Sequence, residues 1–213
     1  MSELMPEYVK IQSVYKRDPE NNHKTFLEGE WSMPEFGYLA NCRWSATEKV
    51  DGTNIRVHYE PQSDIIHFGG RTDNAQIPVF LLEKLQEHFN KEKFAEHFDC
   101  PVTLYGEGYG AKIQKGGGNY IPNGVDFILF DVLIGGMWLE RVNVLDVGLK
   151  LNIGVVPEIE NLTLYEAIQK CRSGFRSGWG DFEAEGLVLR PDVELQTRRG
   201  QRVITKVKCR DFR

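Results

Sequence analysis

The sequence has no long apolar segment and few cysteines. No run approaches the roughly 20 apolar residues that a membrane span requires, and the first ten residues, MSELMPEYVK, lack the apolar core of a signal peptide. The four cysteines stand singly, without a CxxC pair or any other metal-binding spacing. We therefore expect a cytoplasmic protein with no membrane partner, whose reduced thiols fill its core.

An excess of positive charge is absent as well. The 26 lysines and arginines are outnumbered by 31 acidic residues, and the net charge of −5 argues against a protein that coats nucleic acid by bulk attraction. Residues 198–213 nevertheless contain a single acid, Asp211, and seven basic residues: Arg198, Arg199, Arg202, Lys206, Lys208, Arg210 and Arg213. From charge alone, a solvated surface strand and a phosphate-facing groove are equally good interpretations.

Two familiar catalytic patterns are also missing. The histidines show no HExxH spacing and are interpreted as structural. The three glycines at 116–118 do not belong to a GxxxxGK[ST] P-loop, and they predict a mobile loop. With 213 residues, 41% hydrophobic and 27% charged, the chain has an ordinary globular composition, and we expect a single domain over residues 1–213.

The remaining pattern predicts strand clusters and isolated helices. Alternating apolar residues in TNIRVHYE and DIIHFGGRT predict a β-hairpin, and helical spacing predicts an amphipathic helix over residues 78–97. Thr163 and Glu166 match a capping box, which predicts a second helix over residues 164–172, with Gly174 just past its end. Further strands are expected in VTLYGEGYG, VDFILFDVLI, GLVLRP and RVITKVK. This order indicates an α+β fold of antiparallel sheets with flanking helices.

Polar residues interrupt the strand-like sequence in several segments. These are EKVDGTN (48–54), GGRT (69–72), YGEGYG (105–110), FILFD (127–131), and EGLVLR with KVK (185–190 and 206–208). Each segment alone is a weak signal, because a lysine at the end of a strand or a phenylalanine within one is usually structural. Their weight comes from their occurrence in one chain and in one order.

This ordered set resembles the covalent nucleotidyltransferase superfamily of ATP-dependent DNA ligases, RNA ligases and mRNA capping enzymes. The resemblance covers nearly the whole chain and implies an ATP-grasp-like nucleotidyltransferase (adenylyltransferase) domain. It identifies Lys49 as the nucleophile that forms a covalent lysyl-AMP, and Lys206 and Lys208 as the catalytic lysines of the last motif. The residues implied to bind nucleotide are Glu48 at the adenine edge, Arg71, Glu107 at the ribose hydroxyls, Phe130 stacked on adenine, and Glu185.

The chemistry of lysine agrees with this interpretation. A lysine amine with the ordinary pKa of about 10.4 is almost wholly protonated at pH 7, and only the neutral amine is a nucleophile. Lys206 and Lys208 are two apart on a predicted strand, so both point to one face, where they favour the neutral nucleophile and hold the α-phosphate of ATP. Expulsion of pyrophosphate implies Mg²⁺ or Mn²⁺, held by Glu185, with Asp51 as a second candidate.

Asn54 distinguishes between the ligase groups. ATP-dependent DNA ligases usually place arginine at this position, whereas KxDGTN and GEGYGAKIQKGGGNY resemble RNA ligases related to phage T4 RNA ligase 2, some of which carry histidine where this chain has Asp51. The resemblance implies RNA repair, in which AMP is transferred to a 5′-phosphate end and that end is joined to a 3′-OH end of RNA or of an RNA-containing nicked duplex. The residues expected to contact polynucleotide are Asn54, Arg198, Arg199, Arg202 and Arg210.

Other functions stay open at this point. An ATP-dependent DNA ligase shares the motifs, a capping guanylyltransferase performs the same Lys49 chemistry with GTP, and a non-catalytic nucleic-acid-binding module needs only the basic strand. The sequence ends five residues after Lys208, without the OB or helical C-terminal domain of related enzymes. We therefore expect a minimal ligase, a shortened chain, or a ligase whose partner protein supplies the missing domain.

Overall fold

The computed structural model describes residues 5–213, which form two compact units. Unit 1 consists of Met1–Tyr8, of which residues 5–8 are described, and Asp51–Val156, and unit 2 consists of Val9–Val50 and Pro157–Arg213. The chain therefore passes from one unit to the other after Tyr8, Val50 and Val156. A single nucleotidyltransferase domain over residues 1–213 stays a prediction, and each unit is described by itself.

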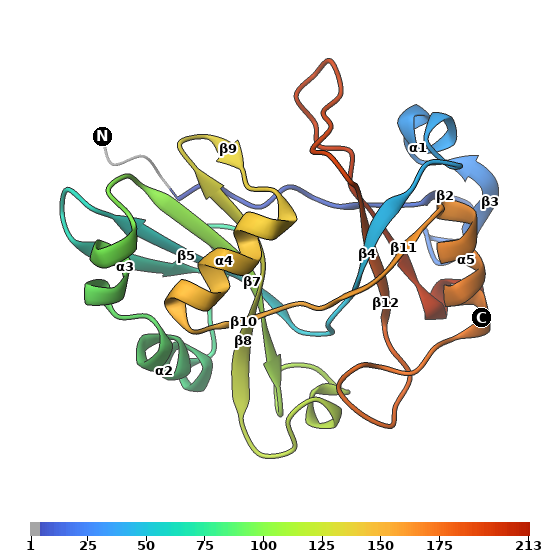
Figure 1. The fold of residues 1–213 in the computed structure, drawn as a ribbon. Helices are drawn as coiled ribbons and strands as arrows, with labels where there is room; N and C mark the ends of the chain where they lie inside the picture. Colours follow the sequence, from blue (N-terminus) through green and yellow to red (C-terminus); the bar gives the residue numbers. More distant parts are fainter. Residues whose placement is uncertain (1–4) are drawn as a thin grey trace. The chain divides into compact units, whose positions relative to one another are not determined.

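Unit 1 is built on a mainly antiparallel sheet. Its strands are β5 (Thr53–Glu60), β6 (Ile65–Gly69), β7 (Val102–Gly110), β8 (Val125–Ile134), β9 (Met137–Trp138) and β10 (Gly154–Val155). The strand order is β10-β8-β7-β5-β6, with β9 paired to β8, and β10 joins β8 in parallel (Figure 1). The predicted hairpin, now β5 and β6, and the predicted strands β7 and β8 are confirmed.

Three helices pack against this sheet: α2 (Val79–His88), α3 (Lys91–His97) and α4 (Arg141–Leu151). The prediction of one continuous helix over residues 78–97 is wrong. Phe89 has an extended backbone, and the Asn90 side chain begins a new helix by accepting a hydrogen bond from the Lys93 N–H (3.0 Å). The sequence did not predict α4, because apolar residues such as Val142 and Leu149 lie on its exposed side and obscure the periodicity.

Unit 2 contains the strands that carry the predicted lysine motifs. They are β1 (Gln12–Ser13), β4 (Trp44–Glu48), β11 (Glu158–Leu162), β12 (Gly186–Pro191) and β13 (Thr205–Lys208), in the order β1-β13-β12-β4-β11. β1 is parallel to β13 and the other pairs are antiparallel. The strand expected over RVITKVK is shorter than predicted, since it begins at Thr205. The α+β class with antiparallel sheets and flanking helices is nevertheless confirmed.

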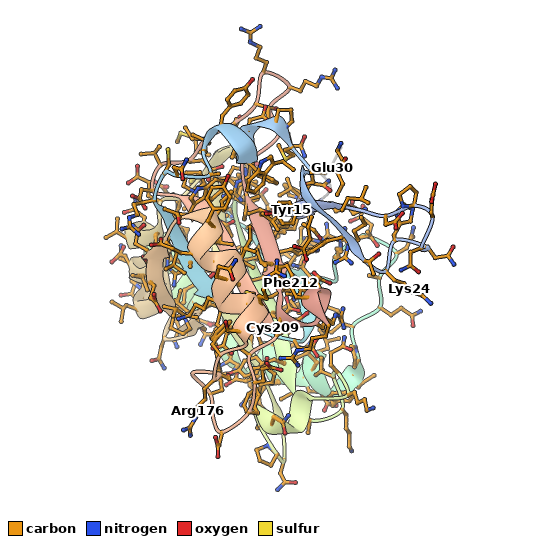
Figure 2. All side chains as sticks on the ribbon, turned by 90° about the vertical axis from the view of Figure 1, so that its right-hand side faces the viewer. Tyr15, Lys24, Glu30, Arg176, Cys209 and Phe212 are labelled. Carbon is orange, nitrogen blue, oxygen red and sulfur yellow. The ribbon has the colours of Figure 1, made fainter. Side chains whose placement is uncertain are left out.

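The remaining elements of unit 2 close its core. They are the β2 (Tyr15–Arg17) and β3 (Phe26–Trp31) ribbon, α1 (Pro34–Tyr38), α5 (Leu164–Ser173) and the 3-10 turn η2 (Cys209–Phe212). The predicted capping box of α5 is present in both directions between Thr163 and Glu166. Figure 2 looks onto this side of the unit, with Cys209 and Phe212 beside α5.

The cysteines behave less uniformly than expected. Cys171 and Cys209 are buried, but Cys100 is only half-buried and Cys42 is exposed, so the prediction that all four thiols fill the core is wrong for Cys42. All four are free thiols. Within residues 5–213, no helix is both long enough and apolar enough to cross a membrane.

Candidate active site

Lys49 lies in unit 2, directly after the last residue of β4. Its backbone N–H donates to the Gly186 carbonyl at the start of β12 (2.9 Å), which fixes the point where the lysine leaves the sheet. Its Nζ donates to Glu185 Oε2 (2.7 Å) and to the Val50 carbonyl (3.3 Å). The side chain keeps 21% of its surface exposed, so the amine is held in place but remains accessible.

Glu185 joins two lysines. Its second carboxylate oxygen, Oε1, pairs with Lys208 Nζ at 2.6 Å, so both oxygens of one carboxylate bind ammonium groups. Gly186, next to it, sits opposite Lys208 with φ of 153°, and a Cβ there would lie 2.1 Å from the Val207 carbonyl. The Glu-Gly pair therefore allows β12 and β13 to approach closely and brings Lys49, Glu185 and Lys208 together.

The two ammonium charges set the ionisation of Glu185. Burial acts to raise the pKa of this carboxyl, but the charge of Lys49 and the hydrogen bond and charge of Lys208 outweigh burial, so the pKa is lowered. Glu185 is therefore ionised at neutral pH. Lys206 is half-buried on β13, on the same side as Lys208, while Thr205 and Val207 alternate into the interior. The shared face predicted for the two lysines is confirmed, whereas a catalytic role for Lys206 stays a prediction.

Glu48, the last residue of β4, is buried and hydrogen-bonded to the protein itself. It is 2% exposed, and its oxygens accept hydrogen bonds from the Ser177 hydroxyl (2.6 Å) and the Gly178 N–H (2.8 Å). Burial raises its pKa, and these two hydrogen bonds offset part of the increase. Glu48 thus ties the loop that precedes Glu185 to the end of β4. Sequence reasoning missed Ser177, because a serine in a glycine-rich loop has no distinguishing pattern.

The turn after Val50 belongs to unit 1. The Asp51 N–H donates to the Tyr120 hydroxyl oxygen (3.1 Å), and the Gly52 carbonyl accepts from Gln114 Nε2 (3.0 Å). Gly52 has no room for a side chain, because a Cβ would lie 2.3 Å from the Gly108 carbonyl of β7. The glycine run predicted as a mobile loop contains the hydrogen-bonded 3-10 turn η1 (Gly117–Asn119), and its mobility stays a prediction.

Asn54 and Glu107 face each other across β5 and β7. Opposed residues in a sheet project to the same face, so these two predicted site residues are neighbours. The Asn54 side-chain oxygen is shielded from solvent, and no described residue donates a hydrogen bond to it. An acceptor left in this state costs about 1 to 3 kcal/mol until a donor reaches it.

Phe130 lies in a β-bulge of β8, in unit 1. Tyr105 pairs with Asp131 and Gly106 with Leu129, so Phe130 is the extra residue of the bulged strand. It is half-buried, and its ring lies 5.1 Å from the ring of Tyr8. The sequence predicted Phe130 as a site residue, but the bulge in which it lies has no sequence signature.

Arg71 lies on an exposed bend directly after β6 and Gly70. The residues around it are held by Arg56, a fully buried arginine of β5 that the sequence analysis did not single out. In TNIRVHYE, Arg56 occupies a polar position that alternation assigns to solvent, which is why the pattern concealed it.

The predicted polynucleotide arginines divide into two groups. Arg198 and Arg199 are exposed at the tip of the hairpin between β12 and β13, here named the arginine hairpin (residues 192–204). Thr197 organises this tip, because its N–H donates to the Gln201 carbonyl (2.8 Å) and its hydroxyl oxygen accepts from the Arg199 and Gln201 N–H groups (3.3 and 3.2 Å). Both arginines can therefore reach a polyanion from an ordered turn.

Arg202 is held inside the arginine hairpin, and its contact to polynucleotide stays a prediction. Its side chain is 2% exposed and binds both carboxylate oxygens of Glu194, at 2.6 and 2.7 Å. A guanidinium engaged in this bidentate pair stabilises the stem of the arginine hairpin. Arg210, in η2, is exposed.

The donor set also limits how a divalent ion can bind. Within the described part of the chain there is no group of three or more His, Cys, Asp or Glu side chains able to hold a metal ion. Glu185, the predicted metal ligand, has an ammonium group on each oxygen. These residues fit an ion that keeps its waters and is held largely by nucleotide phosphates, as Mg²⁺ commonly is, rather than a protein cage.

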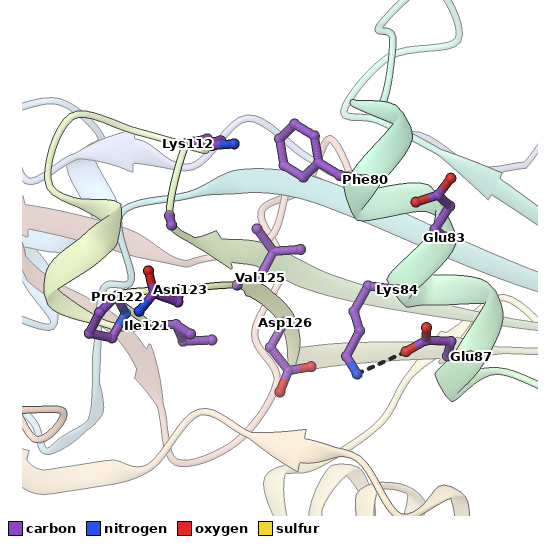
Figure 3. A pocket seen from close by; sticks show the side chains of 12 residues that line it. Phe80, Glu83, Lys84, Glu87, Lys112, Ile121, Pro122, Asn123, Val125 and Asp126 are labelled. Atoms are coloured by element: carbon purple, nitrogen blue, oxygen red, sulfur yellow. Dashed lines mark hydrogen bonds and ion pairs between the residues drawn. The ribbon is translucent and has the colours of Figure 1, made fainter.

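A separate pocket lies in unit 1, between α2 and residues 121–126 (Figure 3). Its volume is about 690 Å³, and its wall includes Glu83, Asp126 and the Lys84–Glu87 ion pair. Of the described residues that line it, none is a predicted site residue. The chemistry described above therefore lies elsewhere.

Comparisons with known proteins identify a family and similar folds. The RNA ligase family model matches residues 43–208. An apo variant of Naegleria gruberi RNA ligase is 18% identical with a TM-score of 0.66, and the match covers 100% of this chain and 60% of that one. A variant solved with ATP and Mn is 17% identical with a TM-score of 0.70, covering 96% and 56%. The chain thus spans about 60% of the length of these ligases, and at this identity the likeness shows the fold. A search of curated protein sequences finds no match.

Proposed function

The chain belongs to the RNA ligase family, and we propose that it is an ATP-dependent RNA ligase that works through a lysyl-AMP at Lys49. AMP then passes to a 5′-phosphate end, and that end is joined to a 3′-OH end. The observation that carries this proposal is the carboxylate of Glu185, which holds Lys49 and Lys208 at 2.7 and 2.6 Å. A partly exposed lysine fixed by a buried acid beside a second cation suits nucleophilic attack on a phosphate.

The first step uses residues of unit 2. The Lys49 amine attacks the α-phosphorus of ATP, a nitrogen–phosphorus bond forms, and the bond to the bridging oxygen breaks as pyrophosphate leaves. Before the attack the Lys49 ammonium group releases one proton to solvent and its ion pair with Glu185 breaks, while Lys208 supplies positive charge for the phosphate. A bound Mg²⁺ or Mn²⁺, held through water by Glu185 with Asp51 as the second candidate, would neutralise the charge of the phosphates.

The nucleotide contacts come from the other predicted residues. Glu107 is proposed to bind the ribose hydroxyls, Phe130 to stack on adenine, and Arg71 to bind nucleotide through its charge. The buried state of Glu48 supports a role in holding the 177–178 backbone, and a contact from Glu48 to the adenine edge stays a prediction. Lys206 is proposed to act with Lys208.

The test of this function is covalent labelling. The protein is incubated with Mg²⁺ and α-labelled ATP or GTP and then separated under denaturing conditions. We expect label from ATP that stays with the protein and is discharged by added pyrophosphate, because the first step is reversible. Label from GTP would instead support a capping guanylyltransferase, and no label from either nucleotide would support a non-catalytic nucleic-acid-binding module.

The proposed substrate is an end or nick whose 3′-OH strand terminates in RNA. The shielded Asn54 oxygen lacks a donor among the described residues, and it supports this proposal because a ribose 2′-OH that reached it would supply that donor. We expect a nick with a terminal ribose to be sealed at least about tenfold faster than the matched all-DNA nick, the worth of one hydrogen bond to a buried acceptor. Sealing is measured on the two duplexes at low and moderate salt. Equal or faster joining of the all-DNA nick would favour the DNA ligase alternative.

The proposed polynucleotide contacts are Asn54 together with the exposed arginines Arg198, Arg199 and Arg210. Because these arginines neutralise phosphates, binding should weaken as salt rises. The Arg202–Glu194 pair supports the stem of the arginine hairpin, and a direct contact from Arg202 to polynucleotide stays a prediction. A partner protein that supplies a further domain, and a cytoplasmic location, stay predictions.

A further inference from the structure

A buried row of side chains crosses the sheet of unit 1. Arg56 on β5 lies opposite Gly69 on β6 and Tyr105 on β7, and Tyr105 lies opposite Asp131 on β8. Opposed residues share a face, so Arg56, Tyr105 and Asp131 form one line, on the face opposite the core residue Ile55. Arg56 and Tyr105 are 0% exposed and Asp131 is 1% exposed.

The segment of residues 5–8, here named the N-terminal strap, is bound along this row. The contacts are Arg56 Nη1 to the Met5 carbonyl (2.7 Å), Tyr105 Oη to the Pro6 carbonyl (3.0 Å), and Tyr8 Oη to Asp131 Oδ2 (2.8 Å). Consecutive parts of the strap therefore meet consecutive members of the row. This match explains how a charged residue in the middle of a sheet can be fully buried, since each buried polar group has a partner.

The same arginine holds the bend that carries Arg71. Its Nε donates to the Gly70 carbonyl (2.6 Å), and its Nη2 pairs with Asp73 Oδ1 (2.9 Å). The Asp73 N–H in turn donates to Glu7 Oε1 of the strap (3.3 Å). The backbone is thus fixed on both sides of Arg71, while Arg71 itself is exposed.

We infer that Arg56 is a positioning residue for Arg71, with the N-terminal strap as the third anchor of the same guanidinium. The planar guanidinium group of Arg56 binds Gly70, Asp73 and the strap at the same time. A lysine here could not make all three contacts, because its ammonium group is a single point charge. Loss of Arg56 removes the contacts that hold both ends of the bend, so Arg71 is no longer held in the orientation that ATP binding requires. This inference rests on the proposed function, because it assigns Arg71 to the nucleotide.

The first test needs no nucleotide. Trypsin cleaves after an exposed arginine only where the backbone can open locally, so the rate of cleavage after Arg71 reports how firmly the bend is held. We expect Arg56→Met to raise this rate at least about tenfold, as measured by mass spectrometry of the fragment that ends at Arg71. Asp73→Asn, at a half-exposed side chain, should raise it less. An unchanged rate in both variants would overturn the inference.

The second test asks whether Arg56 acts through Arg71. The ATP concentration that gives half-maximal adenylation of Lys49 is measured in the parent protein, Arg56→Met, Arg71→Ala and the double variant. We expect each single change to raise it about tenfold, and the double variant to match Arg71→Ala alone, because residues that act as a unit are not additive. Effects that multiply would show that Arg56 acts independently of Arg71 and would contradict the inference.

Controls separate this inference from stability and from the proposed function. Arg43→Met removes another paired arginine, exposed and in unit 2, and should change neither readout. Thermal unfolding is followed in every variant, and Asp73→Asn replaces Arg56→Met if the latter does not fold. No label in the parent protein would contradict the proposed function, whereas the trypsin result would still support or overturn the positioning role.

Discussion

We expect Lys49→Ala to abolish the covalent AMP adduct while the protein keeps its fold. Removing the nucleophile should lower adduct formation by at least about 10³-fold, since neighbouring groups cannot replace an attacking amine. The fold should survive, because Lys49 keeps 21% of its surface exposed and Glu185 retains Lys208 as a partner. The measurement is label retained from α-labelled ATP, with thermal unfolding followed in parallel.

Lys16→Ala is the matched control for this substitution. Lys16 is also a lysine of unit 2 paired with a glutamate, but its ion pair with Glu30 is exposed on both sides. Its loss should leave the adduct at the parent level. An undiminished adduct in Lys49→Ala would assign the nucleophile to another residue, and a mapped AMP-peptide would identify which one.

The second large effect is expected for Glu185→Ala. The change leaves the Lys49 and Lys208 ammonium groups close together without their shared carboxylate, and breaking a buried pair in this way costs about 3 to 5 kcal/mol. Because the three side chains remain 11 to 21% exposed, we expect the free energy of unfolding to fall by about 3 kcal/mol, at the lower end of this range. Adenylation should fall by more than about 10²-fold. Urea unfolding and the labelling assay measure the two effects.

The ionisation of Glu185 gives this prediction a pH signature. Its pKa is lowered in the folded protein, because the lysine charges outweigh the effect of burial. The stability from its ion pairs is therefore complete above the unfolded glutamate pKa of about 4.3 and is lost as pH falls through the lower folded value. Glu185→Gln should remove this part of the acid dependence. Glu183→Gln, in the exposed pair with Arg213, is the control and should keep it.

The central role given to this carboxylate would be contradicted if the Glu185→Ala variant unfolded at the same urea concentration as the parent protein and still formed the AMP adduct. The same would follow if Glu185→Gln kept the whole acid dependence of stability. Loss of adenylation without loss of stability would instead limit Glu185 to the reaction itself. These outcomes separate the ion-pair role from the catalytic one.

Local sequence patterns determined several of the strands and helices of this protein. The alternation in TNIRVHYE predicted β5, and the capping box at Thr163 and Glu166 predicted α5, because each depends on residues adjacent in the chain. The same kind of pattern placed Lys206 and Lys208 on one face of a strand. The order of the motifs indicated the family before any contact was known.

Only the tertiary structure decided how these groups are used. Glu185 binds both Lys49 and Lys208 where three strands end. Glu48 accepts hydrogen bonds from Ser177 and Gly178, and Arg202 forms an ion pair with Glu194. The burial of Arg56 beneath the N-terminal strap depends on partners 14 to 51 residues away, and the bulge at Phe130 depends on its register with β7. The physical reason is common to all of them: the environment of a charge is set by partners distant in sequence, which strand and helix periodicity does not encode.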